Sequence, residues 1–195
     1  MTHQTCFEKA LFLIDQANSE DPNREEWQGK NYPKEQLYAE RMFSQMQLFC
    51  PDASEVLQIA ARAQHIQRWV LKRKDFPEGP VGYKHWRTTQ GKFHAETTAK
   101  LMLEAGYQQI DADRVMVLLQ KKQLKRDPEV QTLEDVICLV FLEFYLNPFA
   151  AKHSEDKMLS IIQKTWKKMS TKGHDAALKL PFTDDMLALV KKALS

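Results

Sequence analysis

The sequence has few residues that break secondary structure, no long apolar run and little net charge. Its six glycines and eight prolines in 195 residues are too few for the many turns of an all-β protein. No window approaches the roughly 18 apolar residues that a membrane span requires, so we expect no membrane partner. The formal net charge of +2 is too small to indicate nucleic-acid binding by itself.

Cysteine is also scarce. Cys6, Cys50 and Cys138 are an odd number, lie far apart and form no CxxC pair, which argues against a disulfide scaffold or a zinc ribbon. The first residues, "MTHQTCFEKALFLIDQ", lack a basic region before a long apolar run and carry Glu8 and Asp15, so they do not resemble a signal peptide. We therefore expect reduced thiols and a cytoplasmic location.

The composition is that of a globular protein. Hydrophobic residues make up 43% and charged residues 28%, and a chain of this length can bury one core. We expect a single domain over residues 1–195, with its core at about 5–170 and a C-terminal helix at about 183–194. No alternating βα pattern is present, so a parallel sheet is not expected.

Apolar residues recur at helical spacing along most of the chain. The pattern predicts an all-α bundle of about seven or eight helices, with a long ordered loop at 71–90 and a shorter loop around Trp27. The expected helices are 7–14, 33–50, 53–69, 92–106, 111–124, 133–146, 154–166 and 183–194. Asp52, Ser154 and Thr183 are candidate N-caps, Thr132 with Asp135 resembles a capping box, and Gly106 is expected to end its helix.

The stretch "KKMSTKGHD", Lys167 to Asp175, resembles two known motifs. "KMSTK" is similar to the nucleotide-closing loop of class I aminoacyl-tRNA synthetases, and "HD" is similar to the metal-binding dipeptide of HD phosphohydrolases. The synthetase loop needs a parallel sheet, which is not expected, and no histidine follows position 175 to complete an HD site. We therefore interpret Lys167 and Lys168 as the end of a helix, Gly173 as its terminator, and His174 as exposed or capping.

A degraded HD-domain pattern lies upstream. "LYAERM" resembles the first HD element, with Tyr38 at the position of the metal-binding histidine. "IAARAQHI" resembles the second, with Gln64 and His65 at the His-Asp positions. "FHAETTAKLMLEAGY" resembles the helix of the third histidine and keeps His94, and "LEDVICLVFLEFYL" resembles the last helix, with Glu143 at the aspartate position. This resemblance implies an HD-like fold.

Longer shared stretches resemble the family called domain of unknown function 4202. They include "ARAQHIQRW", "DPEVQTLEDVICLVFLE" and "TWKKMSTKGH", and they span roughly Leu11 to Leu180. The resemblance implies an all-helical cytoplasmic protein and supplies no reaction.

His65, His94 and Glu143 form a candidate catalytic and metal-binding set. Two imidazoles and one carboxylate are suitable ligands for one divalent ion such as Zn, Mn or Fe, with Glu40 or Glu96 as a possible fourth. Structural roles are the alternative. A buried Glu143 needs a partner, such as Arg41, Arg62 or His65. His65 could equally be a hydrogen-bonded core histidine and His94 a surface or capping residue.

Basic residues near these positions indicate an anionic ligand. Arg68, Arg87 and Lys122 are candidate phosphate-binding residues, with Tyr38 and Gln64 as further ligand-binding candidates. The preferred ligand is a nucleotide or a phosphorylated small molecule, and Trp69 and Trp86 could stack a base or anchor the core. For "KKQLKR", residues 121–126, a solvated helix face is the alternative.

Two functions follow from these residues. The first is a divergent HD-like phosphohydrolase acting on a nucleotide or phosphorylated metabolite, with a metal or the residues themselves as acid and base. The alternative is a non-catalytic nucleotide- or RNA-binding module that has lost the HD metal site. A purely structural partner protein is a third possibility.

Overall fold

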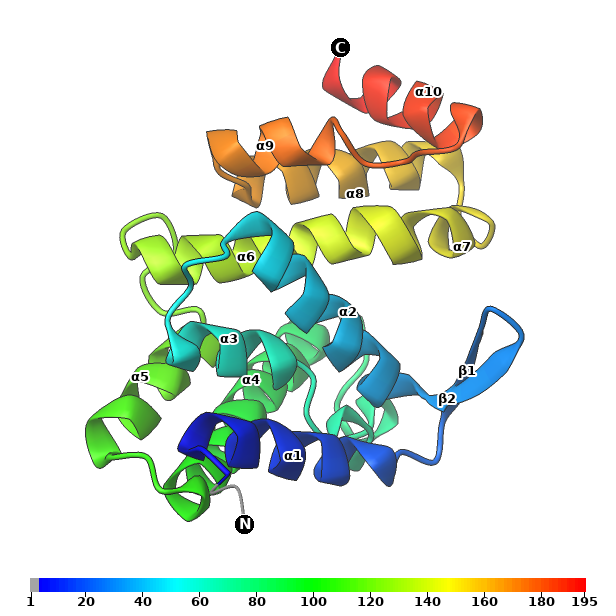
Figure 1. Ribbon diagram of the computed structural model, residues 1–195. Helices are drawn as coiled ribbons and strands as arrows, with labels where there is room; N and C mark the ends of the chain where they lie inside the picture. The colour runs from blue at the N-terminus through cyan, green and yellow to red at the C-terminus, as the bar shows by residue number, and fades with distance from the viewer. Residues whose placement is uncertain (1–3) are drawn as a thin grey trace. The chain divides into compact units, whose positions relative to one another are not determined.

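The computed structural model describes residues 4–195, which are mostly helical (Figure 1). The predicted all-α class is confirmed, with one small two-stranded sheet added. The chain divides into two compact units, one ending at Gln123 and the other spanning Leu124–Ser195. The prediction of one domain over 1–195 stays a prediction. Among residues 4–195, no helix has both the length and the apolar character needed to cross a membrane.

Unit 1 is a group of packed helices whose starts follow from local capping. Thr5 and Glu8 form a capping box at the start of α1, and Ser54 accepts a hydrogen bond from the backbone of Leu57 to begin α3. Ser54 therefore takes the capping role predicted for Asp52. The helices of this unit are α1 (Cys6–Ser19), α2 (Lys34–Phe49), α3 (Glu55–Arg62), α4 (Gly79–Ala105) and α5 (Gln109–Leu119).

A β-hairpin occupies the loop predicted around Trp27. Strands β1 (Arg24–Trp27) and β2 (Lys30–Pro33) pair antiparallel. Gln28 and Gly29 between them have φ of 51° and 75°, and two central residues with positive φ match the twist of a hairpin. Arg41 on α2 contacts Glu25 at 2.6 Å, which ties the hairpin to the helices.

Helix α4 begins much earlier than the sequence pattern predicts, so the predicted loop at 71–90 is wrong for residues 79–90. The prediction is wrong there because glycine and proline usually interrupt a helix, and Gly79 and Pro80 lie in this stretch. Proline is tolerated in the first turn, where its missing N–H would have no partner anyway. The predicted C-terminal end is confirmed, since Gly106 caps the helix with φ of 107°.

Unit 2 contains a central helix that is longer than predicted. Asp127 caps α6 (Pro128–Val140), and the helix continues through a π-helical turn (Phe141–Tyr145) into α7 (Leu146–Ala150). The predicted capping box is wrong, because the Thr132 hydroxyl donates to the Pro128 carbonyl within the helix. In the same unit α8 (Glu155–Lys168) and α9 (Thr171–Ala177) pack against α6, and α10 (Asp184–Leu194) packs against α8. Thr183 caps α10 as predicted.

The "KMSTK" stretch, residues 168–172, connects α8 to α9 in unit 2. Ser170 caps α9, and its backbone N–H and hydroxyl both donate to the Asp135 carboxylate, at 2.7 and 2.5 Å. Gly173 lies inside α9, so the prediction that it ends a helix is wrong. A Cβ there would stand 2.7 Å from an Asp135 oxygen, which explains why this position is glycine. His174 stacks on Trp166 with ring centroids 4.3 Å apart. These contacts account for the motif without a nucleotide.

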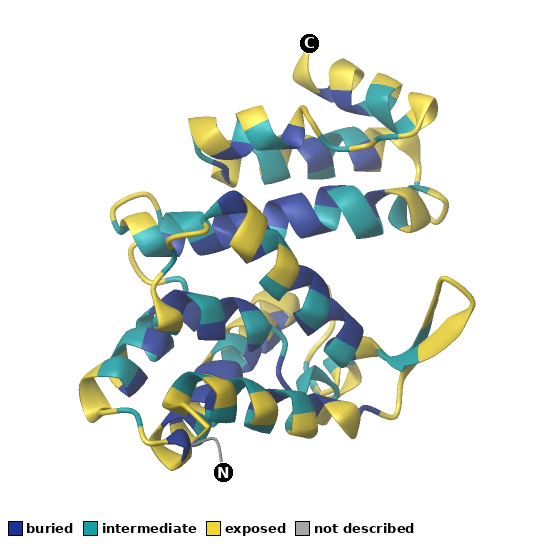
Figure 2. Ribbon diagram, viewed as in Figure 1, coloured by how far each residue is buried: buried dark blue, intermediate teal, exposed yellow. Residues whose placement is uncertain are grey.

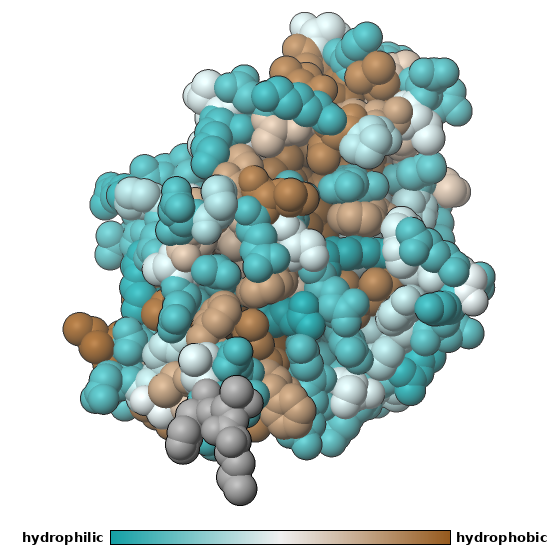
Figure 3. Space-filling view, viewed as in Figure 1, coloured by the Kyte–Doolittle hydropathy of each residue, from teal (hydrophilic) through white to brown (hydrophobic). Residues whose placement is uncertain are grey.

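Burial along each helix follows its apolar stripe (Figure 2). In unit 1 the largest fully buried side chains are Ile14, Met42, Met46, Leu57, Ile59, Ile66, Met102 and Leu118. Figure 3 shows hydrophilic side chains over much of one face, with apolar groups among them. The core of unit 1 thus supports α4 and the segment that follows α3, which carry most of the site described below.

Two glycines of α4 provide a matched test of its early start. A Cβ on Gly82 would lie 1.8 Å from the Pro77 carbonyl oxygen, whereas one on Gly91 would meet only the Leu119 carbonyl at 3.7 Å. We expect Gly82→Ala to lower the free energy of unfolding by about 2 kcal/mol or more. Gly91→Ala should raise it by roughly 0.5–1 kcal/mol through helix propensity. Urea denaturation measures both, and a neutral Gly82→Ala would contradict the helical start at Gly79.

Candidate functional site

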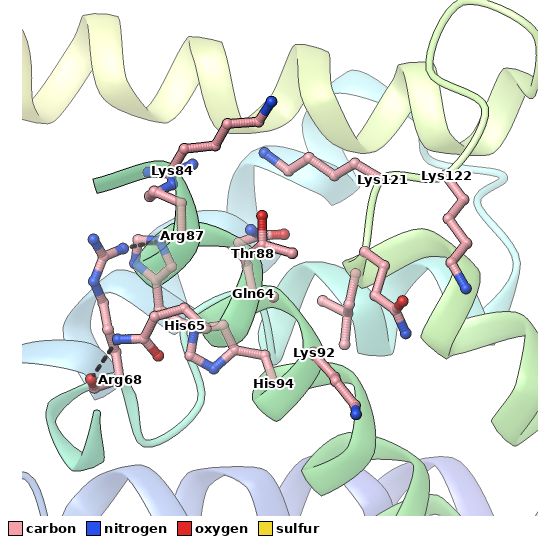
Figure 4. A pocket seen from close by; sticks show the side chains of 14 residues that line it. Gln64, His65, Arg68, Lys84, Arg87, Thr88, Lys92, His94, Lys121 and Lys122 are labelled. Atoms are coloured by element: carbon pink, nitrogen blue, oxygen red, sulfur yellow. Dashed lines mark hydrogen bonds between the residues drawn. The ribbon is translucent and has the colours of Figure 1, made fainter. Parts of the chain in front are cut away.

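A pocket of about 460 Å³ lies within unit 1. Its walls come from the segment after α3, from α4 and from the end of α5 (Figure 4). The cationic side chains in its lining are Arg68, Lys84, Arg87, Lys92, Lys121 and Lys122, and the lining includes no carboxylate. The remaining lining side chains are polar apart from Leu119. The pocket is therefore suited to an anion.

Local structure explains how these side chains meet. Lys84, Arg87, Thr88, Gly91 and His94 recur at helical spacing on α4 and face the pocket. In Figure 4 the side chains of Lys84 and Lys121 extend toward one another across the pocket.

The segment after α3 carries Gln64 and His65 in turns and Arg68 at the start of the short 3-10 helix η1 (Arg68–Val70). Gln67 within it has φ of 49°. The Gln67 backbone N–H donates to the Asn18 side chain of α1 at 3.0 Å. The turn is thus held in place by a side chain of α1, and the segment contributes Gln64, His65 and Arg68 to the pocket lining.

His65 uses both ring nitrogens. Its Nδ1 lies 3.2 Å from a Glu35 oxygen, and its Nε2 lies 2.6 Å from a guanidinium nitrogen of Arg68. Because arginine only donates, Nε2 must accept and Nδ1 must carry the proton that faces Glu35. Burial first, and then the nearby cations led by Arg68, hold the pKa of His65 well below its usual value. His65 is therefore neutral at pH 7.

The partners of His65 are themselves buried. Glu35 has a raised pKa because burial outweighs the opposing effect of Arg68 and Lys34. The Tyr38 ring stacks on His65 with centroids 4.0 Å apart. Tyr38 therefore packs against one face of the imidazole. It is not part of the pocket lining.

His94 is a second neutral imidazole. Its Nδ1 lies 2.7 Å from the Ile66 carbonyl oxygen, and since a carbonyl only accepts, Nδ1 carries the proton. Burial, with a smaller contribution from His65, lowers the pKa of His94 to about 3. The ring centroids of His65 and His94 are 6.1 Å apart. The lone pair of His94 Nε2 is not used by the bond to Ile66.

The structure brings together most of the site residues predicted from sequence. Gln64, His65, His94, Arg68, Arg87 and Lys122 all line the pocket. Glu143 lies in unit 2, half-buried in the π-helical turn. Arg41 and Arg62, two of the partners considered for it, contact Glu25 and Asp15 in unit 1, each at 2.6 Å. Trp86 is buried and its indole donates to the Leu71 carbonyl, as a core anchor does.

Several site residues were missed by the sequence argument. Lys84, Thr88 and Gln90 lie in the predicted loop but belong to α4. Lys84 and Thr88 are one helical turn apart, as are Gln90 and His94, and this spacing is a signal once Gly79 is accepted as a helix start. Lys121 follows α5 with φ of 54°, and its signal in the sequence is the basic run "KKQLKR", residues 121–126. Glu35 lies in the first turn of α2, and nothing in the sequence links it to His65.

The contacts around the two histidines do not suit a metal ion. Both nitrogens of His65 are occupied, one by an arginine whose charge opposes a cation. Within residues 4–195, no group of three or more His, Cys, Asp or Glu side chains is placed to hold a metal. The predicted set of His65, His94 and Glu143 with Zn, Mn or Fe stays a prediction that these contacts do not support.

The fold and pocket define a class of helical proteins with a cationic pocket that encloses two neutral histidines. Comparison with family models assigns the chain more narrowly. The model described as domain of unknown function (DUF4202) matches residues 8–190, so the chain belongs to this family. Comparison with curated proteins found no match, and neither did comparison with solved structures.

The low pKa of His94 predicts a loss of stability in acid. Unfolded histidine has a pKa near 6.5, whereas that of His94 in the fold is about 3, so the unfolded chain binds more protons between these values. The contribution is fully present above about pH 6.5 and is lost as pH falls toward 3, at up to ~1.4 kcal/mol per pH unit.

We expect His94→Gln to show a smaller fall in unfolding free energy between pH 7 and pH 5 than the unaltered protein. Denaturation at the two pH values measures it, and His65 and Glu35, whose pKa values are also shifted, contribute to both proteins. Equal falls would contradict a neutral, buried His94.

Proposed function

We propose that unit 1 binds the phosphate group of a nucleotide or phosphorylated small molecule in this pocket. The observation that supports the proposal is the six cationic side chains of the lining without any carboxylate among them. Cations gathered in a concave site attract a multiply charged anion more strongly than the same charges spread over a surface. Arg68 and Arg87 are suited to bidentate contacts with phosphate oxygens, and the lysines to single contacts.

An HD-like fold for the helical core is part of this proposal. Three of the four matching positions converge in unit 1, where Tyr38 stacks on His65 and His65 lies beside His94. This convergence supports the resemblance, because the three residues come from α2, from the segment after α3 and from α4. The cytoplasmic location is proposed on the three free cysteines.

Hydrolysis of the bound phosphate ester is the second candidate function. It is favoured by His94, whose Nε2 keeps a lone pair beside a phosphate-binding pocket. With a pKa of about 3, His94 is a weak base in the empty pocket. A bound phosphate would raise that pKa, because a nearby anion favours the protonated imidazole. His94 could then exchange a proton with the attacking water or the leaving group. RNA remains the alternative ligand for the same cations.

Removal of two cations from opposite walls should weaken binding. We expect Arg87→Ala and Lys122→Ala each to raise the Kd of ATP or of inorganic phosphate by about 5–30-fold, since a charged hydrogen bond contributes roughly 1–2 kcal/mol in a solvated pocket. Lys100→Ala is the matched control, because Lys100 is an exposed lysine of α4 outside the pocket lining.

Calorimetry at two salt concentrations measures these values. Equal weakening by Lys100→Ala, or no binding by the unaltered protein, would contradict the proposal. Retention of transfer RNA with a steep salt dependence, together with no response to ATP, would indicate the RNA alternative.

Hydrolysis is tested by phosphate release from a panel of phosphate esters, with and without added divalent metal, together with elemental analysis of the purified protein. We expect His94→Gln to lower kcat by about 100-fold or more if His94 transfers the proton. Ligand-induced stabilisation without phosphate release would leave binding as the function, and unchanged turnover in His94→Gln would contradict the role of His94.

A further inference from the structure

Two buried amide oxygens of the pocket lining are left without a hydrogen bond from the described residues. Gln90 lies on α4, is 4% exposed and lines the pocket. Its side-chain nitrogen donates to the carbonyl oxygens of Arg68 and Leu71, at 2.9 and 3.0 Å. These two bonds settle the orientation of the amide. Its Oε1 is buried and accepts no hydrogen bond from residues 4–195.

Two neighbours repeat this arrangement. His94 follows Gln90 by one helical turn, is 3% exposed, and its bond to the Ile66 carbonyl makes Nε2 an acceptor. Gln64, next to His65 in sequence, is 7% exposed, and its Oε1 is buried without a partner among the described residues. We call Gln64 Oε1, Gln90 Oε1 and His94 Nε2 the acceptor cluster. Figure 4 shows Gln64 and His94 on the inner side of the pocket, near Thr88 and His65.

A buried acceptor without a donor is unfavourable, and proteins rarely keep one without a ligand, water or functional reason. The group that satisfies this cluster must supply O–H or N–H donors. A cationic donor such as an ammonium group is disfavoured by Arg68, Arg87 and the four lysines of the same pocket. Uncharged hydroxyl groups meet both requirements.

We propose that the ligand is a phosphorylated polyhydroxy compound, such as a sugar phosphate or the sugar and phosphate of a nucleotide. This proposal rests on the proposed function, because the cations hold the phosphate. The acceptor cluster then binds the hydroxyl groups beside it. The pocket thereby distinguishes hydroxylated phosphates from plain alkyl phosphates of equal charge and similar size.

Two small probes separate these contributions. Glycerol 3-phosphate and n-propyl phosphate have the same three-carbon chain and the same phosphate, and only the first has hydroxyl groups. Calorimetry at one salt concentration should give glycerol 3-phosphate a Kd about 10-fold lower or more, because each hydroxyl–acceptor bond contributes roughly fivefold in affinity. Ribose 5-phosphate should share this preference.

The outcomes distinguish the two proposals. If both probes bind with equal affinity, the phosphate site stands and the acceptor cluster is satisfied by water, which overturns this inference. If neither probe nor ribose 5-phosphate binds, the proposed function fails with it.

A variant assigns the preference to the cluster. Gln64→Met keeps the length of the side chain and removes one of the three acceptors, so it should reduce the preference by about fivefold. Gln47→Met, at an exposed position of α2, is the matched control and should retain the preference. His94→Phe serves as a second variant if Gln64→Met lowers the melting temperature. A full preference in both pocket variants would contradict the role of the cluster.

Discussion

Hydrogen bonds from side chains of α4 hold the segment of turns and short 3-10 helix that carries His65 and Arg68, and the pocket depends on these bonds. Gln90 and Trp86 of α4 donate to carbonyls at Arg68 and Leu71. His94 donates to the carbonyl of Ile66. Buried backbone outside helices and sheets must find such partners or lose free energy. Gln90 and His94 of α4 thus both anchor the segment and line the pocket, so the stability of the site and its chemistry depend on the same side chains.

As a consequence, the pocket places several cations next to uncharged imidazoles. The cations lie among side chains whose imidazoles remain neutral, because burial and neighbouring cations lower the pKa values of His65 and His94. Glu35 lies behind His65 and fixes its tautomer. An arriving anion would change this balance, since it offers Arg68 a partner other than the nitrogen of His65. Binding of the proposed anion would therefore be coupled to the proton affinity of the histidines.

Sequence patterns predicted the helices well where an apolar stripe and a cap agreed, as at α10 with Thr183. They failed where one residue type has different effects at different positions of a helix. Proline breaks a helix when it lies in the interior but is tolerated in the first turn. Because Pro80 lies in the first turn of α4, the twelve helical residues Gly79–Gln90 were predicted as a loop. Gly173 ends many helices, yet here it lies inside α9 because the Asp135 carboxylate leaves no space for a side chain.

The sequence by itself determined the all-helical class, the family, and the nature of most pocket residues, because these depend on composition, local spacing and long shared stretches. Only the tertiary structure decided which carboxylate meets His65. That partner is Glu35, 30 residues upstream, and the predicted Glu143 belongs to the other unit. The reason is physical. Hydrogen-bond partners, burial and the resulting pKa shifts arise from packing between helices, which the periodicity along one helix does not predict.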